Sequence, residues 1–133
     1  MSEKNHIQPD TLFDSSMYGF TQVVTSSPGT LVYCSGQVAL DKSGSLVGET
    51  IATQTEQALK NVGLALEAAG ATPADLTHLR FYIPNYEPKH AQQLAPYLDA
   101  FLGDARPPAQ TMIGVQALAF PGLLIEIEAT AVI

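Results

Sequence analysis

The sequence predicts a single α+β domain over residues 1–133, with one mixed β-sheet that carries two helices on one face. Residues 50–69 place apolar side chains at three- and four-residue steps, as an amphipathic helix does. Residues 76–83 and 123–133 alternate apolar and polar side chains, which is typical of strands with one buried face. The predicted order of elements is strands, helix, strand, helix and two strands, and this order favours helices gathered on one side of a sheet.

The first third of the chain predicts two strands after a lead-in over residues 1–16. Residues 20–25 form a plausible short strand, which ends at a turn over residues 26–29 that contains Pro and Gly. A second strand begins at residue 31 and runs through Ser35 and Gly36 towards residue 40. A glycine inside a strand pattern indicates a bulge or a close backbone approach.

The remaining elements follow from periodicity and from proline and glycine positions. The helix over residues 50–69 is expected to stop at Gly70. A second helix is expected from Pro88 to Gly103, with a kink or a restart at Pro96. We expect two last strands, over residues 110–118 and 123–133, to pair as a hairpin. The exposed face of such a sheet favours self-association.

Composition excludes several classes of function. The chain has 13 acidic and 6 basic residues, a net charge of -7, and its Lys and Arg residues are scattered, which disfavours nucleic-acid binding. The single cysteine, Cys34, cannot form an internal disulfide and is expected to be a buried small side chain. No apolar signal core or membrane-length apolar run occurs, so the prediction is a cytoplasmic protein without a membrane partner.

Metal and cofactor signatures are also missing from the sequence. His6, His78 and His90 are too dispersed for a metal site, so none is predicted. No phosphate-binding glycine loop or dinucleotide fingerprint is present, and no cofactor is predicted.

The last predicted strand carries the strongest indication of chemistry. Glu126 and Glu128 share the face opposite its apolar residues. A carboxylate among apolar neighbours is costly unless it is solvated, paired or used in function. Solvation alone explains the pair about as well as function does, when only the strand is considered. Because side chains two residues apart do not easily reach one ligand atom, Glu128 is expected to make structural contacts.

Four segments, in this order and spacing, resemble the Rid superfamily of reactive intermediate deaminases, the YjgF family. They cover nearly the whole chain and read Gly19-Phe20-Thr21-Gln22-Val23, Tyr33-Cys34-Ser35-Gly36-Gln37-Val38, Gln57-Ala58-Leu59-Lys60-Asn61-Val62 with Glu67-Ala68-Ala69-Gly70, and Ile125-Glu126-Ile127-Glu128-Ala129. The resemblance implies a chorismate-mutase-like fold and a homotrimer whose sheets line a central barrel. It also implies small-molecule clefts between subunits, in which imines and enamines are hydrolysed to keto acids and ammonia.

The resemblance carries over to individual residues only in part. Glu126 matches the family's water-positioning glutamate, and Ser35 and Gly36 match its Ser-Gly pair. Phe20 stands where a tyrosine is expected, and Met112 replaces a cysteine. Gln110 replaces the arginine that clamps the substrate carboxylate.

The Gln110 replacement bears most directly on the substrate. Arginine offers a charged, two-pronged hydrogen bond to a carboxylate, whereas glutamine is neutral. Its loss should weaken the binding of an anionic group at that place by roughly 2–5 kcal/mol. Gln110 either binds an uncharged polar group or fills the space of the former arginine. Tyr18 could supply a hydroxyl, although an ordinary surface position explains it better.

Two functions remain open, and a third is disfavoured. The first is hydrolysis of a reactive imine, enamine or related metabolite that is not anchored by a carboxylate, with Glu126 positioning water. The second is non-catalytic binding of a small metabolite in the same cleft. The third, ribonuclease activity, has been attributed to relatives, but the acidic balance argues against it.

Overall fold

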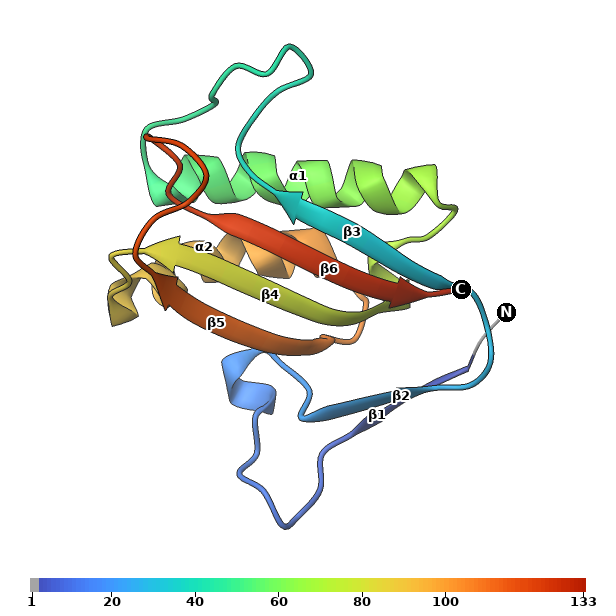
Figure 1. The fold of residues 1–133 in the computed structure, drawn as a ribbon. Helices are drawn as coiled ribbons and strands as arrows, with labels where there is room; N and C mark the ends of the chain where they lie inside the picture. Colours follow the sequence, from blue (N-terminus) through green and yellow to red (C-terminus); the bar gives the residue numbers. More distant parts are fainter. Residues whose placement is uncertain (1–2) are drawn as a thin grey trace.

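A computed structural model describes residues 3–133 of the chain. Four strands form one sheet in the order β3-β6-β4-β5, and two short strands form a second sheet (Figure 1). Strands β3 and β5 are therefore the two edges of the larger sheet. The elements are β1 (Lys4–Ile7), a 3-10 turn (Ser16–Tyr18), β2 (Val23–Ser26), β3 (Leu31–Gln37), α1 (Ile51–Ala68), a 3-10 turn (Pro73–Asp75), β4 (Leu76–Pro84), α2 (Pro88–Leu102), β5 (Ala109–Val115) and β6 (Glu126–Val132).

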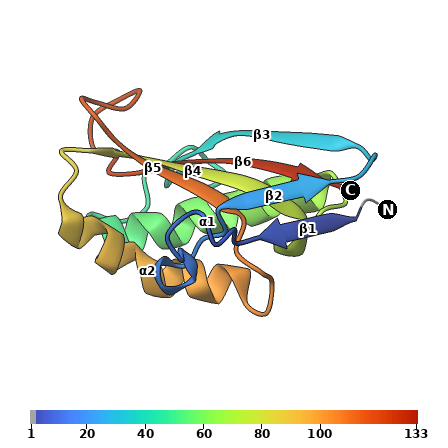
Figure 2. The same ribbon diagram turned by 90° about the horizontal axis from the view of Figure 1, so that it is seen from below.

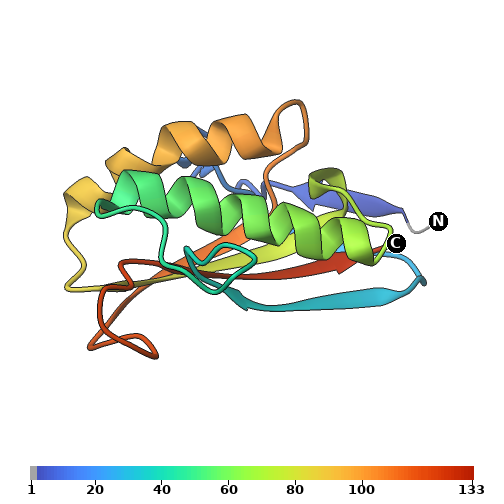
Figure 3. The ribbon, with the colours of Figure 1, turned by 90° about the horizontal axis from the view of Figure 1, so that it is seen from above.

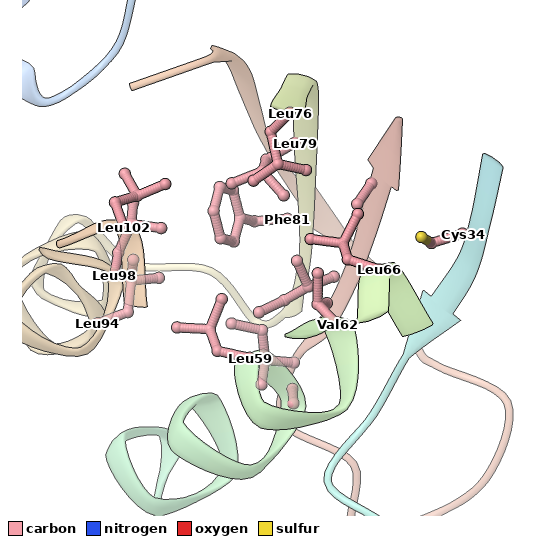
Figure 4. Packing of buried hydrophobic residues seen from close by; sticks show 14 of the residues in the cluster. Cys34, Leu59, Val62, Leu66, Leu76, Leu79, Phe81, Leu94, Leu98 and Leu102 are labelled. Atoms are coloured by element: carbon pink, nitrogen blue, oxygen red, sulfur yellow. The ribbon is translucent and has the colours of Figure 1, made fainter. Parts of the chain in front are cut away.

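Both helices cover the same face of the larger sheet, as the sequence predicts. The views along the sheet show α1 and α2 on the same side of it, below the sheet in Figure 2 and above it in Figure 3, and the opposite face uncovered. The core between these layers is apolar, with Phe81 from β4 at its centre and fully buried (Figure 4). Cys34 lies at the border of this core, and burial raises the pKa of its thiol.

Helix α1 forms where the apolar periodicity predicts it. Thr50 precedes it as the N-cap, and its hydroxyl accepts a hydrogen bond from the amide of Thr53 at 3.2 Å. The side chains predicted to form the buried stripe of this helix are buried except for the last, Ala69, because the helix ends at Ala68; they are Ile51, Thr55, Ala58, Leu59, Val62, Leu66 and Ala69. Helix α2 begins at Pro88 and runs through Pro96 to Leu102, so the helix does not restart at Pro96, and a kink there stays a prediction.

The predicted hairpin between the last two strands is also wrong. Strand β4 pairs with β5 in parallel and with β6 in antiparallel orientation, so it separates them. The physical reason is the crossover through α2, which returns the chain to the same end of the sheet and makes β5 a parallel neighbour of β4. Strand β5 ends at Val115, and β6 begins only at Glu126.

The N-terminal segment differs from the prediction as well. The lead-in contains a strand, β1, which pairs with β2 (Figure 1). The strand predicted over residues 20–25 is observed as β2, which begins only at Val23. Thr21 stays outside the strand because it bonds to the segment before β5. Its amide donates to the carbonyl of Pro108 at 3.1 Å and its hydroxyl to that of Pro107 at 2.6 Å. Residues 1–2 of the predicted lead-in lie outside the described part.

In the part of the chain that the structure describes, neither helix is long and apolar enough to cross a lipid bilayer.

Candidate functional site

Glu126 opens strand β6 on the uncovered face of the sheet. Its neighbours Ile125 and Ile127 are buried on the helix side, so the alternation of the strand turns the half-buried Glu126 side chain the other way. In the register with β4, Glu126 lies opposite Tyr82. The structure thus places this carboxylate where solvent and a ligand can reach it.

The Glu126 carboxylate lies directly against the backbone of Gly36. A Cβ atom added at Gly36 would stand 2.6 Å from Cδ of Glu126, which no real side chain can do without displacing the carboxylate. A register shift between Cys34 and Gln37 produces this close approach. The bulge predicted at Gly36 is therefore confirmed, and its effect is to make room for the acid on β6.

The two glutamates of β6 differ in their side-chain contacts. Within residues 3–133, the Glu126 side chain makes no hydrogen bond or ion pair. Glu128 Oε1 accepts the Tyr82 hydroxyl hydrogen at 2.7 Å and lies 3.6 Å from Nη1 of Arg80. These contacts agree with the structural role expected for Glu128 and leave Glu126 as the acid that is available for chemistry.

Electrostatics on this face follow from the same contacts. The hydrogen bond to Glu128, followed by desolvation, raises the pKa of the Tyr82 hydroxyl, which therefore stays protonated. His78 lies nearer the start of β4, and its Nε2 is 3.3 Å from the hydroxyl oxygen of Thr111. Burial and, to a smaller extent, the charge of Arg80 lower the pKa of His78.

A hollow of about 310 Å³ adjoins Glu126. Its polar wall is formed by the two acids of β6 and by Tyr82, and its apolar wall by the segment that follows β5. The lining residues are Tyr82, Val115, Ala117, Leu118, Ala119, Glu126 and Glu128. A hollow of this size holds a small organic molecule.

Gln110 and Met112 do not lie near Glu126 in one protomer. Gln110 stands opposite Leu79 in the β4–β5 register and Met112 stands opposite Phe81, so both point to the helix side of the sheet. Met112 packs against the core, and Gln110 Nε2 donates to the carbonyl oxygen of Gly19 at 3.1 Å. Within one protomer the Glu126 and Gln110 side chains therefore leave opposite faces of the sheet, and a cleft that contains both needs a second copy of the chain.

The remaining site residues predicted from the sequence lie in two separate places, one near β3 and one near β5. Ser35 is exposed on β3, next to Gly36. Phe20 is half-buried beside Gly19, and its ring meets that of Phe13 edge-on at 6.2 Å. Tyr18 is 68% exposed on the same segment. Ser35, Gly36 and Glu126 thus gather at the β3 edge, whereas Phe20, Gln110 and Met112 gather at the β5 edge.

Sequence reasoning missed Gln54, which positions the segment leading into Glu126. Its amide is fully buried in α1 and bonds three backbone groups. Nε2 donates to the carbonyls of Gly122 at 2.8 Å and Gly48 at 3.2 Å, and Oε1 accepts from the amide of Leu124 at 2.8 Å. A polar residue within the apolar stripe of α1 was the available sequence signal.

Metal binding finds no support in the side-chain arrangement. Among residues 3–133, no three His, Cys, Asp or Glu side chains are grouped so that they could hold a metal ion. His6 and His78 lie on different sheets, and His90 caps α2 by accepting from the amide of Glu87.

The fold and this site define a class of small α+β proteins, in which two helices cover one face of a sheet and a free carboxylate lies beside a glycine bulge. Comparisons with known proteins identify the family. The family model described as Endoribonuclease L-PSP matches residues 14–133. The chain therefore belongs to this family, the Rid or YjgF family that the sequence motifs indicate.

Relatives and solved structures agree with this membership. The chain is 33% identical over 106 residues to a 2-iminobutanoate/2-iminopropanoate deaminase of Salmonella typhimurium, covering 78% of this chain and 80% of that protein. It superposes on the crystal structure of YyfB, a Rid protein of unknown function from Yersinia pestis, with a TM-score of 0.93, 43% identity and 98% of both chains covered. For RidA of an Antarctic Psychrobacter, the TM-score is 0.70 at 29% identity, over 86% and 88% of the two chains.

Proposed function

We propose that this protein hydrolyses a reactive imine or enamine to a carbonyl compound and ammonia, with Glu126 positioning the water. The single observation that carries this proposal is the Glu126 carboxylate, which is free of protein partners and is held over the glycine bulge beside a hollow. The likeness to a deaminase that acts on 2-imino acids supports the reaction class.

The proposed reaction needs only one acid-base group from the residues at the β3 edge, and this group is Glu126. The carboxylate of Glu126 accepts a proton from water while the water oxygen bonds to the carbon of the protonated imine, whose C=N π pair moves to nitrogen. Glu126 then returns this proton to the carbinolamine nitrogen, and the C–N bond breaks with its electron pair on ammonia. The carbinolamine hydroxyl becomes the carbonyl and gives its proton to solvent. An enamine follows the same route after it tautomerises to the imine. The carbonyl product and ammonia leave, and no electrons are exchanged.

A complete cleft in this proposal requires two copies of the chain. The β3-edge group contains the acid and the β5-edge group contains Phe20, Gln110 and Met112, and β3 and β5 are opposite edges of one sheet. A head-to-tail contact between copies brings one edge to the other, and such contacts form a ring where the rotation between copies closes. This arrangement supports the homotrimer with clefts between subunits.

The experiment is Glu126→Gln, assayed by the rate of carbonyl release from imines generated in situ. We expect at least about a hundredfold loss of kcat, the usual contribution of a positioned acid-base group. Glu56→Gln, an exposed acid on α1, is the matched control. Unchanged activity in Glu126→Gln refutes the proposal.

The alternative function is non-catalytic binding of a metabolite in the same cleft. One observation favours it, since the Gln110 amide, which stands in the place of the family's arginine, donates a hydrogen bond to the carbonyl of Gly19 within the protein. This alternative predicts thermal stabilisation by a ligand without turnover, because binding to the native state raises stability by mass action.

A further inference from the structure

A hollow larger than the one beside Glu126 lies between α1 and the segment that follows β3. Its volume is about 740 Å³, within the range that holds an elongated organic ligand. The lining residues are Gly36, Gln37, Val38, Leu40, Asp41, Lys42, Gln57, Lys60, Asn61, Leu64 and Ala65. We call this hollow the α1 groove.

One residue connects the α1 groove with the proposed reaction centre. Gly36 lines the groove, and its backbone is in contact with the Glu126 carboxylate, although Glu126 is not itself a lining residue. A molecule whose imine carbon lies at Glu126 has to cross the β3 edge at Gly36 to enter the groove. The apolar part of the lining is formed by Val38, Leu40, Leu64 and Ala65, and Leu64 is 54% exposed.

The charged groups of the α1 groove favour an anion at its far part. Lys42 and Lys60 line it, and they are two of only six basic residues in a chain of net charge -7. Asp41 is the acid among the lining residues. Its carboxylate accepts hydrogen bonds from Ser43 and Ser45, which lower its pKa and occupy it within its own turn.

The polar floor of the α1 groove is rigid. The Nδ2 atom of Asn61 donates to the carbonyls of Val38 and Leu40, both at 2.8 Å. Gln57 Nε2 donates in turn to Asn61 Oδ1 at 2.9 Å. These bonds fix the segment after β3 over α1, so the groove is a formed feature.

We propose that the α1 groove binds the anionic end of an elongated substrate, so that Lys42 and Lys60 take over the anchoring that Gln110 cannot provide. The substrate class is an imine whose carboxylate is separated from the reacting carbon by an apolar chain. This inference rests on the proposed function for its reaction, whereas the groove itself is independent of it. The bond changes are those described above, and the distant carboxylate remains unaltered.

The test uses three imines with the same six-carbon skeleton, each made in situ by an oxidase. The imine of 6-aminohexanoate has a remote carboxylate, the imine of hexylamine has none, and 2-iminohexanoate has an adjacent one. We expect kcat/KM to be highest for the remote carboxylate, about tenfold above the hexylamine imine, as a charge-assisted contact provides. A preference for 2-iminohexanoate, or equal rates for all three, overturns the inference.

Variants separate this inference from the proposed function. Lys42→Gln combined with Lys60→Gln should remove the preference for the remote carboxylate and leave hydrolysis of the hexylamine imine unchanged. Lys89→Gln is the control, since Lys89 is exposed and pairs with Glu87 outside the groove. If all three imines depend on Glu126 without this ranking, the inference fails and the proposed function stands.

A direct binding measurement covers the case in which none of the imines is hydrolysed. Hexanoate should raise the melting temperature more than hexylamine does, and the double lysine variant should abolish the difference. Equal shifts for hexanoate in the parent protein and in the double variant overturn the inference whether or not the protein is an enzyme.

Discussion

At the scale of single residues, contacts divide two glutamates of the same strand between structure and chemistry. Glu128 is held by Tyr82 and Arg80, and Glu126 meets only the backbone of Gly36 among the contacts described. The alternation of β6 was enough to predict that both acids share one face. Which of them is engaged could not be predicted, because Arg80 and Tyr82 come from a strand whose register the sequence does not specify.

Gly36→Ala is expected to lower activity more than stability. The added methyl group overlaps the Glu126 carboxylate, which can swing towards solvent at small cost because no partner holds it. We expect kcat to fall at least about tenfold, given the sensitivity of catalysis to misplacement of a reacting group, and unfolding to change by only about 1 kcal/mol. The measurements are imine hydrolysis and denaturant unfolding. A Gly63→Ala variant, on α1 away from the acid, is the control.

His78 gives the protein a predictable dependence on pH. Because burial and Arg80 lower its pKa in the folded state, the unfolded chain binds the proton more readily. Stability from this group is therefore fully present above the unfolded pKa near 6.5 and is lost as the pH falls through the lower folded value. NMR titration of the His78 ring should show the lowered pKa, and His78→Gln should reduce the fall in unfolding free energy.

Two neighbouring charges should move the His78 pKa in opposite directions. Arg80→Gln removes a repulsive charge and should raise the pKa, whereas Glu128→Gln removes an attractive one and should lower it. Shifts of the same sign in both variants would contradict this assignment.

At the scale of elements, patterns confined to one segment were predictive, and pairings between segments were not. Helix α1 follows its apolar periodicity, and β4 buries Leu79, Phe81 and Ile83 as the alternation indicates. The assumed hairpin failed because strands that follow one another need not pair when a helix connects two of them in parallel. The polar strand β1 was missed because its residues carry no alternating apolar signal.

Gln54 connects α1 to the segment before β6, and its replacement tests that connection. Gln54→Leu keeps the volume but leaves the amide of Leu124 and the carbonyls of Gly122 and Gly48 without their partner. Unsatisfied buried groups of this kind cost about 1–3 kcal/mol each, so we expect the three together to lower the unfolding free energy by at least about 3 kcal/mol. Chemical denaturation measures it, with Gln93→Leu on α2 as the exposed control. Unchanged stability would show that the bonds are dispensable.

At the scale of the whole molecule, the uncovered face and the edges of the sheet are the surfaces on which the proposed association of copies depends. Leu31 and Tyr33 on β3 are 57% and 75% exposed, although both are large apolar or aromatic side chains on the strand beside the candidate site. The family resemblance suggested a ring, and the division of the site residues between the β3 and β5 edges supports it. One sequence could not reveal this division, because the strand order is not apparent from it.

The association state can be measured directly. We expect a mass of three times 14.1 kDa by light scattering or sedimentation. Leu31→Glu should dissociate the assembly and abolish activity, because it places a charge at the expected contact. Leu64→Glu, at a position of similar exposure on the outer side of α1, should leave the mass unchanged. A monomeric parent protein with full activity would contradict the shared cleft.

The place of β6 between β3 and β4 has a consequence for biosynthesis. Every other element of the domain precedes residues 126–132, yet β3 has its ladder partner only in that late segment. A ribosome-bound chain can therefore form α1, α2 and the β4–β5 pair early, whereas β3 has no strand to pair with until β6 has been synthesised. The same late event delivers Glu126, so a nascent chain acquires its interior strand and its reactive acid together.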